Sequence, residues 1–297
     1  MTEWIWFNGQ IVTTQQVKIA VEDRGFQFAD GVYEVIRLYG GKPFTLNEHL
    51  DRLHRSAEAI QIALPFTRDE LTEQILNFIN RVQATDAFIY LQVTRGVAPR
   101  NHLFPQLSNI QTTPTTLFYA RPLAPTADPT ASPGLRLLAV PDDRWKKCWI
   151  KSIALLPNVL AKSAAVAAGA DEAVFIDNGF VTECSASNFF AVINNTLITH
   201  PVGEKVLPGI TRQVLLQCAA KLGIAVQERP MTEGEATGAD ELFITSTTRQ
   251  IGWVSTWNGK SVGLGRCGPI MLALHEALQR RIADEIGFPV PELALAM

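Results

Sequence analysis

The chain has 297 residues, 47% of them hydrophobic, and a formal net charge of -3. This length corresponds to two modest domains or one large domain, and it suffices to bury a core without disulfides or metal ions. Because 26 Lys and Arg stand against 29 Asp and Glu, the composition does not favour binding to nucleic acid or anionic membranes. The chain has no apolar run of about 18 residues and begins without a basic, apolar leader, so we expect neither a membrane span nor a secretory signal.

The cysteine and histidine positions predict neither disulfides nor a metal site. The cysteines are far apart and form no Cys-X-X-Cys pair, at Cys148, Cys184, Cys218 and Cys267. We interpret them as buried thiols in a reducing compartment rather than as a disulfide framework. The spacing of zinc ligands is missing from the histidines His49, His54, His200 and His275. We therefore expect a cytoplasmic globular protein.

Residues 1–120 are predicted to form a small domain of strands and helices. Alternating apolar residues predict strands over Trp4–Thr13, with a hairpin turn at Asn8-Gly9, and over Val32–Tyr39. Apolar residues at helical spacing predict helices over 47–60 and 68–82. Two further strands are expected, at Phe88–Thr94 and Thr116–Ala120.

Residues 121–134 carry four prolines and little apolar periodicity, which is typical of an extended linker between domains. This segment divides the chain into the small N-terminal domain, 1–120, and a larger C-terminal domain, 135–297. No internal repeat suggests a different division.

The larger domain is predicted to contain several strands and two helices. Strands are expected at Leu135–Pro141, Glu172–Asp177, Asn188–Ile193, Thr196–His200, Ile224–Arg229 and Glu241–Ser246, with turns at Asn178-Gly179, Asn194-Asn195 and Asn258-Gly259. Pro208-Gly209 opens a helix that Gly223 closes, and a last helix covers about Pro269–Ile286. Because strands and helices do not alternate regularly, the sequence predicts an α+β fold rather than a doubly wound sheet.

Lys151 is the first candidate for chemistry. It ends an aromatic-rich segment, directly after Trp149 and Ile150. Partial desolvation at such a place favours the neutral, nucleophilic amine. The alternative is an ordinary surface lysine whose stem packs along apolar side chains.

Glu183 and two hydroxyl-rich turns are further candidates. Glu183 follows a predicted strand and would either face a cation or be a turn carboxylate satisfied by its surroundings. The turns 208–211 and 245–248 offer backbone amides and hydroxyls, one of them at a helix N-terminus, where phosphate binds readily. Ordinary helix capping is the alternative for both turns.

Arg100 and His102 lie two residues apart in the loop 95–102. They could bind a carboxylate between them, and a solvated loop is the alternative.

The motifs GxGxxG, GxxxxGK[ST], GxSxG and HExxH are absent. No local signal identifies a function by itself, but the order of these signals along the chain does.

Seven motifs in order along the chain carry a resemblance to a known family. They are 22–35, 47–53, 94–102, 150–152, 182–183, 209–212 and 245–248. From about Glu3 to the last helix, the chain resembles the fold-type IV pyridoxal-phosphate (PLP) enzymes, which include D-amino-acid aminotransferases, branched-chain aminotransferases and aminodeoxychorismate lyases. The resemblance implies a two-domain α+β fold, with a smaller N-terminal α/β domain, a larger C-terminal domain of strands and helices, and the cofactor between them.

The resemblance also assigns the residues that bind the cofactor. Lys151 would form the Schiff base with PLP and, once released, carry the proton between the substrate α-carbon and the cofactor. Glu183 would hold the pyridine nitrogen protonated, so that the ring accepts electrons from the carbanion. The phosphate would be bound by side chains and backbone amides of Arg52, Ile210, Thr211, Ser246 and Thr247.

Within this group, the pattern RGxxxRxH from Arg95 to His102 resembles the signature of D-amino-acid aminotransferases. In that subfamily Arg100, His102 and Tyr33 would bind the substrate α-carboxylate, partly across a subunit boundary, which implies a homodimer. The implied reaction moves an amino group from D-alanine, D-glutamate or a similar donor to 2-oxoglutarate or pyruvate. The implied partners are these small molecules and a second subunit, without nucleic acid or membrane.

Three positions depart from the D-amino-acid pattern, namely Trp149, Ala154 and Ala186. They leave the implied catalytic residues intact but widen the range of substrates to consider, and (R)-amines are included as candidates. A branched-chain L-aminotransferase and an aminodeoxychorismate lyase are the alternatives within the enzyme class. A cofactor-free binding protein on the same fold is the alternative outside it.

Overall fold

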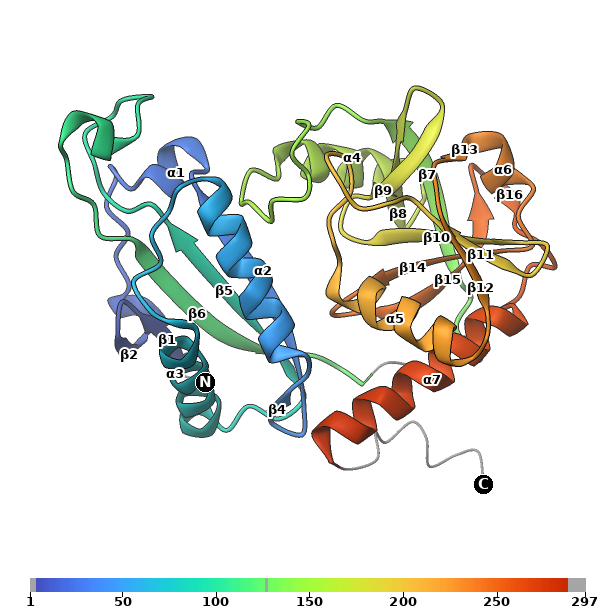
Figure 1. Ribbon diagram of the computed structural model, residues 1–297, viewed down its shortest axis with the longest axis horizontal. Helices are drawn as coiled ribbons and strands as arrows, with labels where there is room; N and C mark the ends of the chain where they lie inside the picture. The colour runs from blue at the N-terminus through green and yellow to red at the C-terminus, as the bar shows by residue number, and fades with distance from the viewer. Residues whose placement is uncertain (1–3, 126–127, 288–297) are drawn as a thin grey trace. The chain divides into compact units, whose positions relative to one another are not determined.

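In the computed structural model the described residues are 4–125 and 128–287 (Figure 1). Residues 1–3, two positions of the expected linker (126 and 127) and the end of the expected C-terminal domain (288–297) lie outside them. The chain divides into two compact units, one of Met1–Ala124 with Ile150–Ala154 and one of Pro125–Trp149 with Leu155–Met297. The return of Ile150–Ala154 to the first unit differs from the single boundary that the sequence predicts. Within the described ranges, none of the helices combines the length and apolar character needed to cross a membrane.

The first unit is built on a six-stranded antiparallel sheet with the strand order β2-β1-β6-β5-β3-β4. Its strands are β1 (Trp4–Phe7), β2 (Gln10–Thr13), β3 (Gly31–Tyr39), β4 (Lys42–Pro43), β5 (Ala87–Thr94) and β6 (Thr115–Pro122). The predicted hairpin at Asn8-Gly9 is confirmed, with φ of 46° and 92° at its two residues. Both values are positive, as the tightest hairpin turn requires.

Helices α2 and α3 cover one face of this sheet (Figure 1). The helices of the unit are α1 (Arg24–Phe28), α2 (Leu46–Ala59) and α3 (Arg68–Val82), with short 3-10 turns at Thr14–Gln16 and Pro105–Ser108. Thr67 and Glu70 form a reciprocal capping box at the start of α3, which explains why its first residue was predictable. Leu50, Ile75 and Phe78 are fully buried in the core between the helices and the sheet.

The segment Ile150–Ala154 pairs with the first half of β3. The backbone amide of Tyr33 donates to the carbonyl of Lys151 over 3.0 Å, and that of Ile153 donates to the carbonyl of Gly31 over 3.1 Å. This edge is available because β4 pairs only with the end of β3, at Leu38 and Tyr39. Lys151 is therefore fixed by the sheet of the first unit, although the chain reaches it after the expected linker.

The second unit contains a ten-stranded mixed sheet with the order β12-β11-β10-β14-β15-β7-β8-β9-β13, and β16 beside β15. Its strands are β7 (Leu135–Pro141), β8 (Glu172–Asp177), β9 (Phe180–Cys184), β10 (Asn188–Ile193), β11 (Thr196–Thr199), β12 (Ala225–Glu228), β13 (Met231–Thr232), β14 (Glu241–Ser246), β15 (Gln250–Trp257) and β16 (Lys260–Ser261). Strand β7 runs parallel to both β8 and β15, and β11 runs parallel to β12. The two helices predicted for this unit are confirmed as α5 (Ile210–Lys221) and α7 (Pro269–Ile286).

Helix α4 (Leu156–Ala167) was not predicted, and α6 (Glu233–Thr237) and a 3-10 turn at Pro129–Ala131 complete the unit. Only Ala165 of α4 is buried, whereas Leu156, Val159 and Leu160 are more than half exposed. The helix therefore lacks the buried apolar stripe on which sequence periodicity depends.

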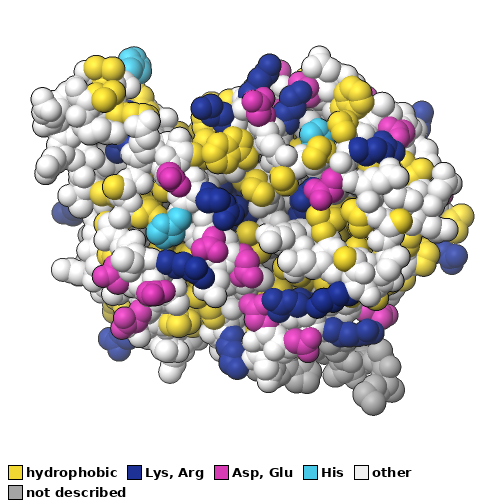
Figure 2. Space-filling view, viewed as in Figure 1, with side chains coloured by type: hydrophobic (Ala, Val, Ile, Leu, Met, Phe, Trp, Pro, Cys, Tyr) yellow, Lys and Arg dark blue, Asp and Glu magenta, His cyan; other side chains and the backbone are white. Residues whose placement is uncertain are grey.

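All four cysteines are free. Three are buried as expected, but Cys267 is only half-buried, so the prediction of burial is wrong for that thiol. On the face shown in Figure 2, acidic and basic side chains are interspersed. This face therefore presents no extended surface of one charge sign.

Candidate active site

Lys151 lies beside Tyr33 at the edge of the first unit's sheet. Its Nζ is 4.1 Å from the centroid of the Tyr33 ring, within the range of a cation–π contact. Its backbone amide donates to Oγ of Ser56 over 3.1 Å, and the side chain is partly exposed. Backbone pairing on one side and Ser56 on the other thus fix the backbone from which the Lys151 side chain projects.

Arg52 is held in a buried charged cluster beneath this edge. Glu34 accepts from Nε of Arg52 over 2.7 Å and from its Nη2 over 2.8 Å, and Nδ1 of His49 lies 2.7 Å from the same carboxylate. Burial opposes ionisation of Glu34, but Arg52 and His49 outweigh it and lower its pKa from 4.5 to about 2. Burial is also the main cause that lowers the pKa of His49, against the effect of Glu34.

Glu34 and His49 were not singled out from the sequence. The available signal is the spacing of His49, Arg52 and Ser56, which puts three polar residues on one face of α2 while all three are buried. A buried polar face on a helix needs a partner, and Glu34 on β3 is that partner.

Arg100 and His102 lie together on the exposed loop after β5. The Arg100 guanidinium sits 4.6 Å from the centroid of the Phe28 ring, and the His102 ring centroid is 5.5 Å from the same ring. Both residues are exposed, whereas Tyr33 is partly buried on β3. The structure therefore brings the expected pair together but gives it no bond to Tyr33 within the described residues.

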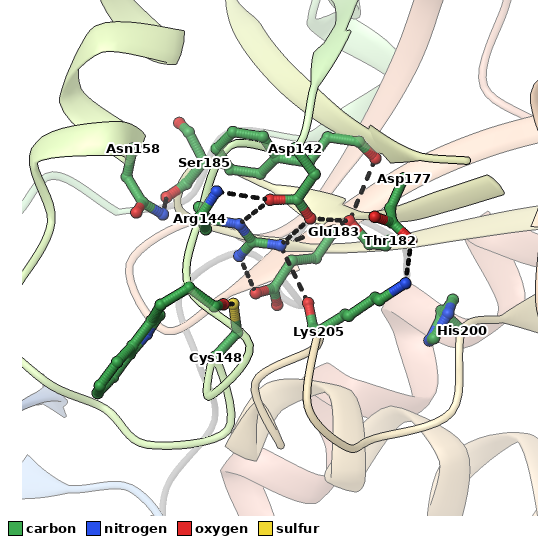
Figure 3. Close-up of polar contacts among 12 residues, drawn as sticks. Asp142, Arg144, Cys148, Asn158, Asp177, Thr182, Glu183, Ser185, His200 and Lys205 are labelled. Atoms are coloured by element: carbon green, nitrogen blue, oxygen red, sulfur yellow. Dashed lines mark hydrogen bonds and ion pairs between the residues drawn. The ribbon is translucent and has the colours of Figure 1, made fainter. Parts of the chain in front are cut away.

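Glu183 is the penultimate residue of β9, and both of its carboxylate oxygens accept N–H donors, of which Figure 3 shows Arg144. Nη1 of Arg144 donates to Oε1 over 2.5 Å. Nδ2 of Asn188 and the backbone amide of Leu207 donate to Oε2, over 3.2 and 3.0 Å. Hydrogen bonds to both oxygens favour the ionised carboxylate, which is the form that can hold a proton on a neighbouring base.

Arg144 was missed in the sequence and is the organising cation of this cluster (Figure 3). It forms a bidentate pair with Asp142, donates to the carbonyl of Lys205 over 3.0 Å, and lies 4.1 Å from the centroid of the Phe175 ring. Burial disfavours its charge, but Asp142 and Glu183 outweigh burial and raise the pKa of Arg144. Burial also raises the pKa of the adjacent Cys148 thiol, to about 11, so that thiol stays protonated at neutral pH. A lone arginine in an aromatic-rich segment gives no signal of this role.

The first turn of α5 has the features of an anion site. No side chain caps the helix at Gly209, so the first turn, with Ile210 and Thr211, begins without a side-chain acceptor for its amides. A Cβ at Gly209 would come within 1.9 Å of Oδ1 of Asn188, so only glycine fits there.

Among the described residues, Oγ1 of Thr245 is a buried hydroxyl without a hydrogen-bond partner, at the position on β14 that pairs with Asn188. Ser246 and Thr247 follow it and are partly exposed.

The chain matches the family model for amino-transferase class IV over residues 31–257. It belongs to the class IV aminotransferases. D-alanine aminotransferase from Bacillus licheniformis is 40% identical over 281 residues, which cover 95% of this chain and 98% of that protein. D-alanine aminotransferase from Staphylococcus haemolyticus is 37% identical over 278 residues, covering 94% and 97%. These findings confirm the family resemblance that the ordered motifs indicate.

Solved structures of class IV aminotransferases share the fold. The branched-chain amino acid aminotransferase of Escherichia coli superposes with a TM-score of 0.84 at 27% identity, covering 96% of each chain. A T.th. branched-chain amino acid aminotransferase with pyridoxamine 5'-phosphate gives 0.86 at 29% identity and covers 95% of each chain. A structure described as a 4-amino-4-deoxychorismate lyase from Legionella pneumophila gives 0.79 at 25% identity, covering 90% of this chain and 96% of that one. The mixed α and β fold of the class IV aminotransferases is thereby confirmed.

Proposed function

We propose that this class IV aminotransferase is a PLP-dependent D-amino-acid transaminase. The observation that carries the proposal is the identity of about 40% over nearly the whole chain to D-alanine aminotransferases, against 27–29% to the branched-chain enzymes of similar fold. The loop with Arg100 and His102 supports the same choice, since the resemblance to D-amino-acid enzymes rests on that pair. The substrates would be D-alanine, D-glutamate or similar donors and a 2-oxo acid acceptor.

The residues present suit a phosphorylated pyridine. The first turn of α5 offers backbone amides to a phosphate. The buried hydroxyl of Thr245 has no hydrogen-bond partner among the described residues, so it is free to bond a ligand. Glu183 offers an ionised carboxylate for a ring N–H, and Lys151 offers a primary amine for an aldehyde. Ile210, Thr211, Ser246, Thr247 and Arg52 are the residues proposed to hold the phosphate.

Each residue then has a chemical task. When bound, PLP supplies the electron sink for the substrate carbanion. Lys151 would accept the proton from the substrate α-carbon and deliver it again, as a general base and acid. Glu183 would keep a proton on the ring nitrogen, and Arg144 would hold the Glu183 carboxylate in place. Arg100, His102 and Tyr33 would bind the substrate α-carboxylate.

We also propose that the enzyme works as a homodimer in which the loop with Arg100 and His102 serves the site of the partner subunit. The loop and its neighbours expose large apolar side chains, with Phe26 76%, Leu103 53% and Leu107 69% exposed. Large apolar side chains exposed together on one surface mark a site of protein–protein association. A symmetric contact would place the exposed pair where a second copy of the chain can use it.

Titration of the purified protein with D-alanine and then with L-alanine tests the proposal. We expect D-alanine alone to convert the bound cofactor to its amine form, followed by its absorption spectrum, with release of one pyruvate per site. Conversion by L-alanine or L-leucine would favour a branched-chain aminotransferase instead. Pyruvate released from aminodeoxychorismate without an amino acceptor would favour the lyase, and a colourless protein that takes up no PLP would favour a cofactor-free function.

A further inference from the structure

Asn188 connects the two parts of the second unit that are proposed to hold the cofactor. It begins β10, and its side chain is buried, with 5% of the residue exposed. Its Nδ2 donates to Oε2 of Glu183 over 3.2 Å and to the backbone carbonyl of Leu207 over 2.9 Å. The two donor hydrogens of the amide are thus both used, one on each partner.

The backbone of Leu207 is also hydrogen-bonded to Glu183 and to Gly209. Its amide donates to the same carboxylate oxygen of Glu183 over 3.0 Å, and its carbonyl also accepts from the amide of Gly209 over 2.8 Å. Glu183, Asn188 and Leu207 therefore bond one another in a closed ring. Gly209, the residue before α5, is attached to that ring through Leu207.

The second contact between Asn188 and α5 is steric. A methyl group added at Gly209 would lie 1.9 Å from Oδ1 of Asn188, although the φ of -64° at Gly209 suits any residue. The glycine is therefore required by the nearness of the Asn188 amide, not by the backbone conformation. One buried side chain consequently sets both the Glu183 carboxylate and the start of the uncapped helix.

We propose that Asn188 is a positioning residue that holds Glu183 and the first turn of α5 in one fixed arrangement. The inference rests on the proposed function, since it concerns the ring-nitrogen and phosphate partners of the cofactor. Loss of the Asn188 amide would leave Glu183 with fewer donors and a greater tendency to take up a proton. The ring nitrogen of the cofactor would then be protonated less completely, and the phosphate would be held less firmly.

The test uses the purified holoenzyme, with Asn188→Ala compared with Asn258→Ala. Asn258 is a matched control because its Nδ2 also donates to a carboxylate, that of Glu233, but at an exposed turn. We expect Asn188→Ala to lose PLP on dilution at least about tenfold faster, as for a hydrogen bond to a charged group. We also expect the 15N signal of ring-labelled PLP to move toward that of an unprotonated pyridine, while Asn258→Ala changes neither.

Gly209→Ala provides an independent route to the same result. The added methyl group touches Asn188 rather than Glu183, and repeating the substitution in the Asn188→Ala background separates an effect through Asn188 from one through Leu207. In the background of Asn188→Ala the methyl group has room, and Gly209→Ala should add little. Asn188→Ser, which keeps a small donor, covers the case in which the alanine variant does not fold and should give a smaller change in both signals.

The outcomes separate the inference from the proposed function. Faster PLP loss with an unchanged nitrogen signal would show general loosening and would overturn the inference. So would an Asn188 variant that behaves like the Asn258 control. A wild-type protein that binds no PLP would contradict the proposed function itself.

Discussion

Buried cations in both units are held by carboxylates from neighbouring elements. Arg52 on α2 is paired with Glu34 on β3, and Arg144 is paired with Asp142 and with Glu183 on β9. Each guanidinium is almost fully enclosed, so each pair stabilises the fold only as long as both members are charged. The stability of the structure around these residues should therefore depend on pH and be sensitive to single substitutions among them.

The first prediction at this scale concerns Lys151. Lys151→Ala removes the amine that is proposed to attack the aldehyde and carry the proton, so we expect the transamination rate to fall by at least about a thousandfold. Lys147→Ala, at an exposed position of the same segment, should leave the rate unchanged. Steady-state rates with D-alanine and 2-oxoglutarate measure both. A Lys151→Ala variant with wild-type turnover would mean that another group does the chemistry.

The second prediction concerns Glu34. Glu34→Gln leaves Arg52 buried without its ion pair, which should lower the free energy of unfolding by about 3 kcal/mol at pH 7. Glu58→Gln, at an exposed position on α2, the helix that carries Arg52, should have almost no effect on the free energy of unfolding. Urea unfolding followed by tryptophan fluorescence gives both values. Equal midpoints for the two variants would show that the pair contributes nothing.

The effect of Glu34 should depend on pH with a definite sign. Its pKa is lowered from 4.5 to about 2 in the folded protein, so the unfolded chain binds the proton first as the pH falls. The stabilisation is complete above about pH 4.5 and is lost as the pH approaches 2. The difference between wild type and Glu34→Gln should therefore shrink across this interval, and a constant difference would contradict the assignment.

The sequence singles out candidate residues for the chemistry more readily than the residues that hold those candidates in place. Lys151 and Glu183 are candidates because they stand in short ordered motifs. Arg144 and Asn188 could not be given their roles, because their partners come from strands and loops far away in the chain. A side chain acquires such a role only when the fold brings distant backbone to it.

At the scale of elements, the edge of β3 decides where Lys151 lies. Gly31 at the start of β3 faces the segment 150–154, and a Cβ there would come within 2.8 Å of the Val93 carbonyl and 2.9 Å of Cδ1 of Ile153. The strand can accept that segment only because residue 31 has no side chain. The small size of Gly31 thus contributes directly to the position of the candidate nucleophile.

Gly31→Ala should consequently disturb the site and the fold together. We expect a loss of about 1–3 kcal/mol in the free energy of unfolding from overpacking, and a lower rate because the 150–154 segment must move. Gly234→Ala is the matched control, since its nearest contact is 3.9 Å away. Unfolding curves and rates measured side by side check both effects. An unchanged rate in Gly31→Ala would show that the pairing does not position Lys151.

The elements differ in how well their sequence predicts them. Helix α3 has a capping box and an apolar stripe, so its predicted limits agree with Arg68–Val82. Helix α4 has neither a buried stripe nor a capping side chain, and its large apolar side chains at Leu156, Val159 and Leu160 are exposed. Likewise, the pairing of 150–154 with β3 joins residues more than a hundred positions apart, which local periodicity cannot report.

At the scale of the whole molecule, the exposed apolar side chains of one chain require an explanation. Val159 and Leu160 on α4 are 56% and 63% exposed, in addition to those around the Arg100 loop. A cavity of about 670 Å³ lies beside the same loop, between residues 61–63 and 106–114. Surfaces of this kind are stable in water when another protein covers them, and a second copy is the simplest cover.

Mixed dimers provide the test of a shared site. A chain with Arg100→Ala and a chain with Lys151→Ala should each be nearly inactive as homodimers. In a mixed dimer, one site would combine the intact Lys151 of the first chain with the intact Arg100 of the second. Co-expression with two different tags and tandem purification should then recover about half of the wild-type activity, since one of two sites is intact.

The control for this experiment pairs a Lys151→Ala chain with a Glu183→Gln chain. In the proposal, one subunit supplies both Lys151 and Glu183 to a given site. Every site of that mixed dimer carries one lesion, so activity should stay at the level of the single variants. If the Arg100 pair also stays at that level, Arg100 belongs to the same subunit's site as Lys151. A protein that sediments as a monomer while fully active would contradict the shared site altogether, and the exposed loop would then need a different partner.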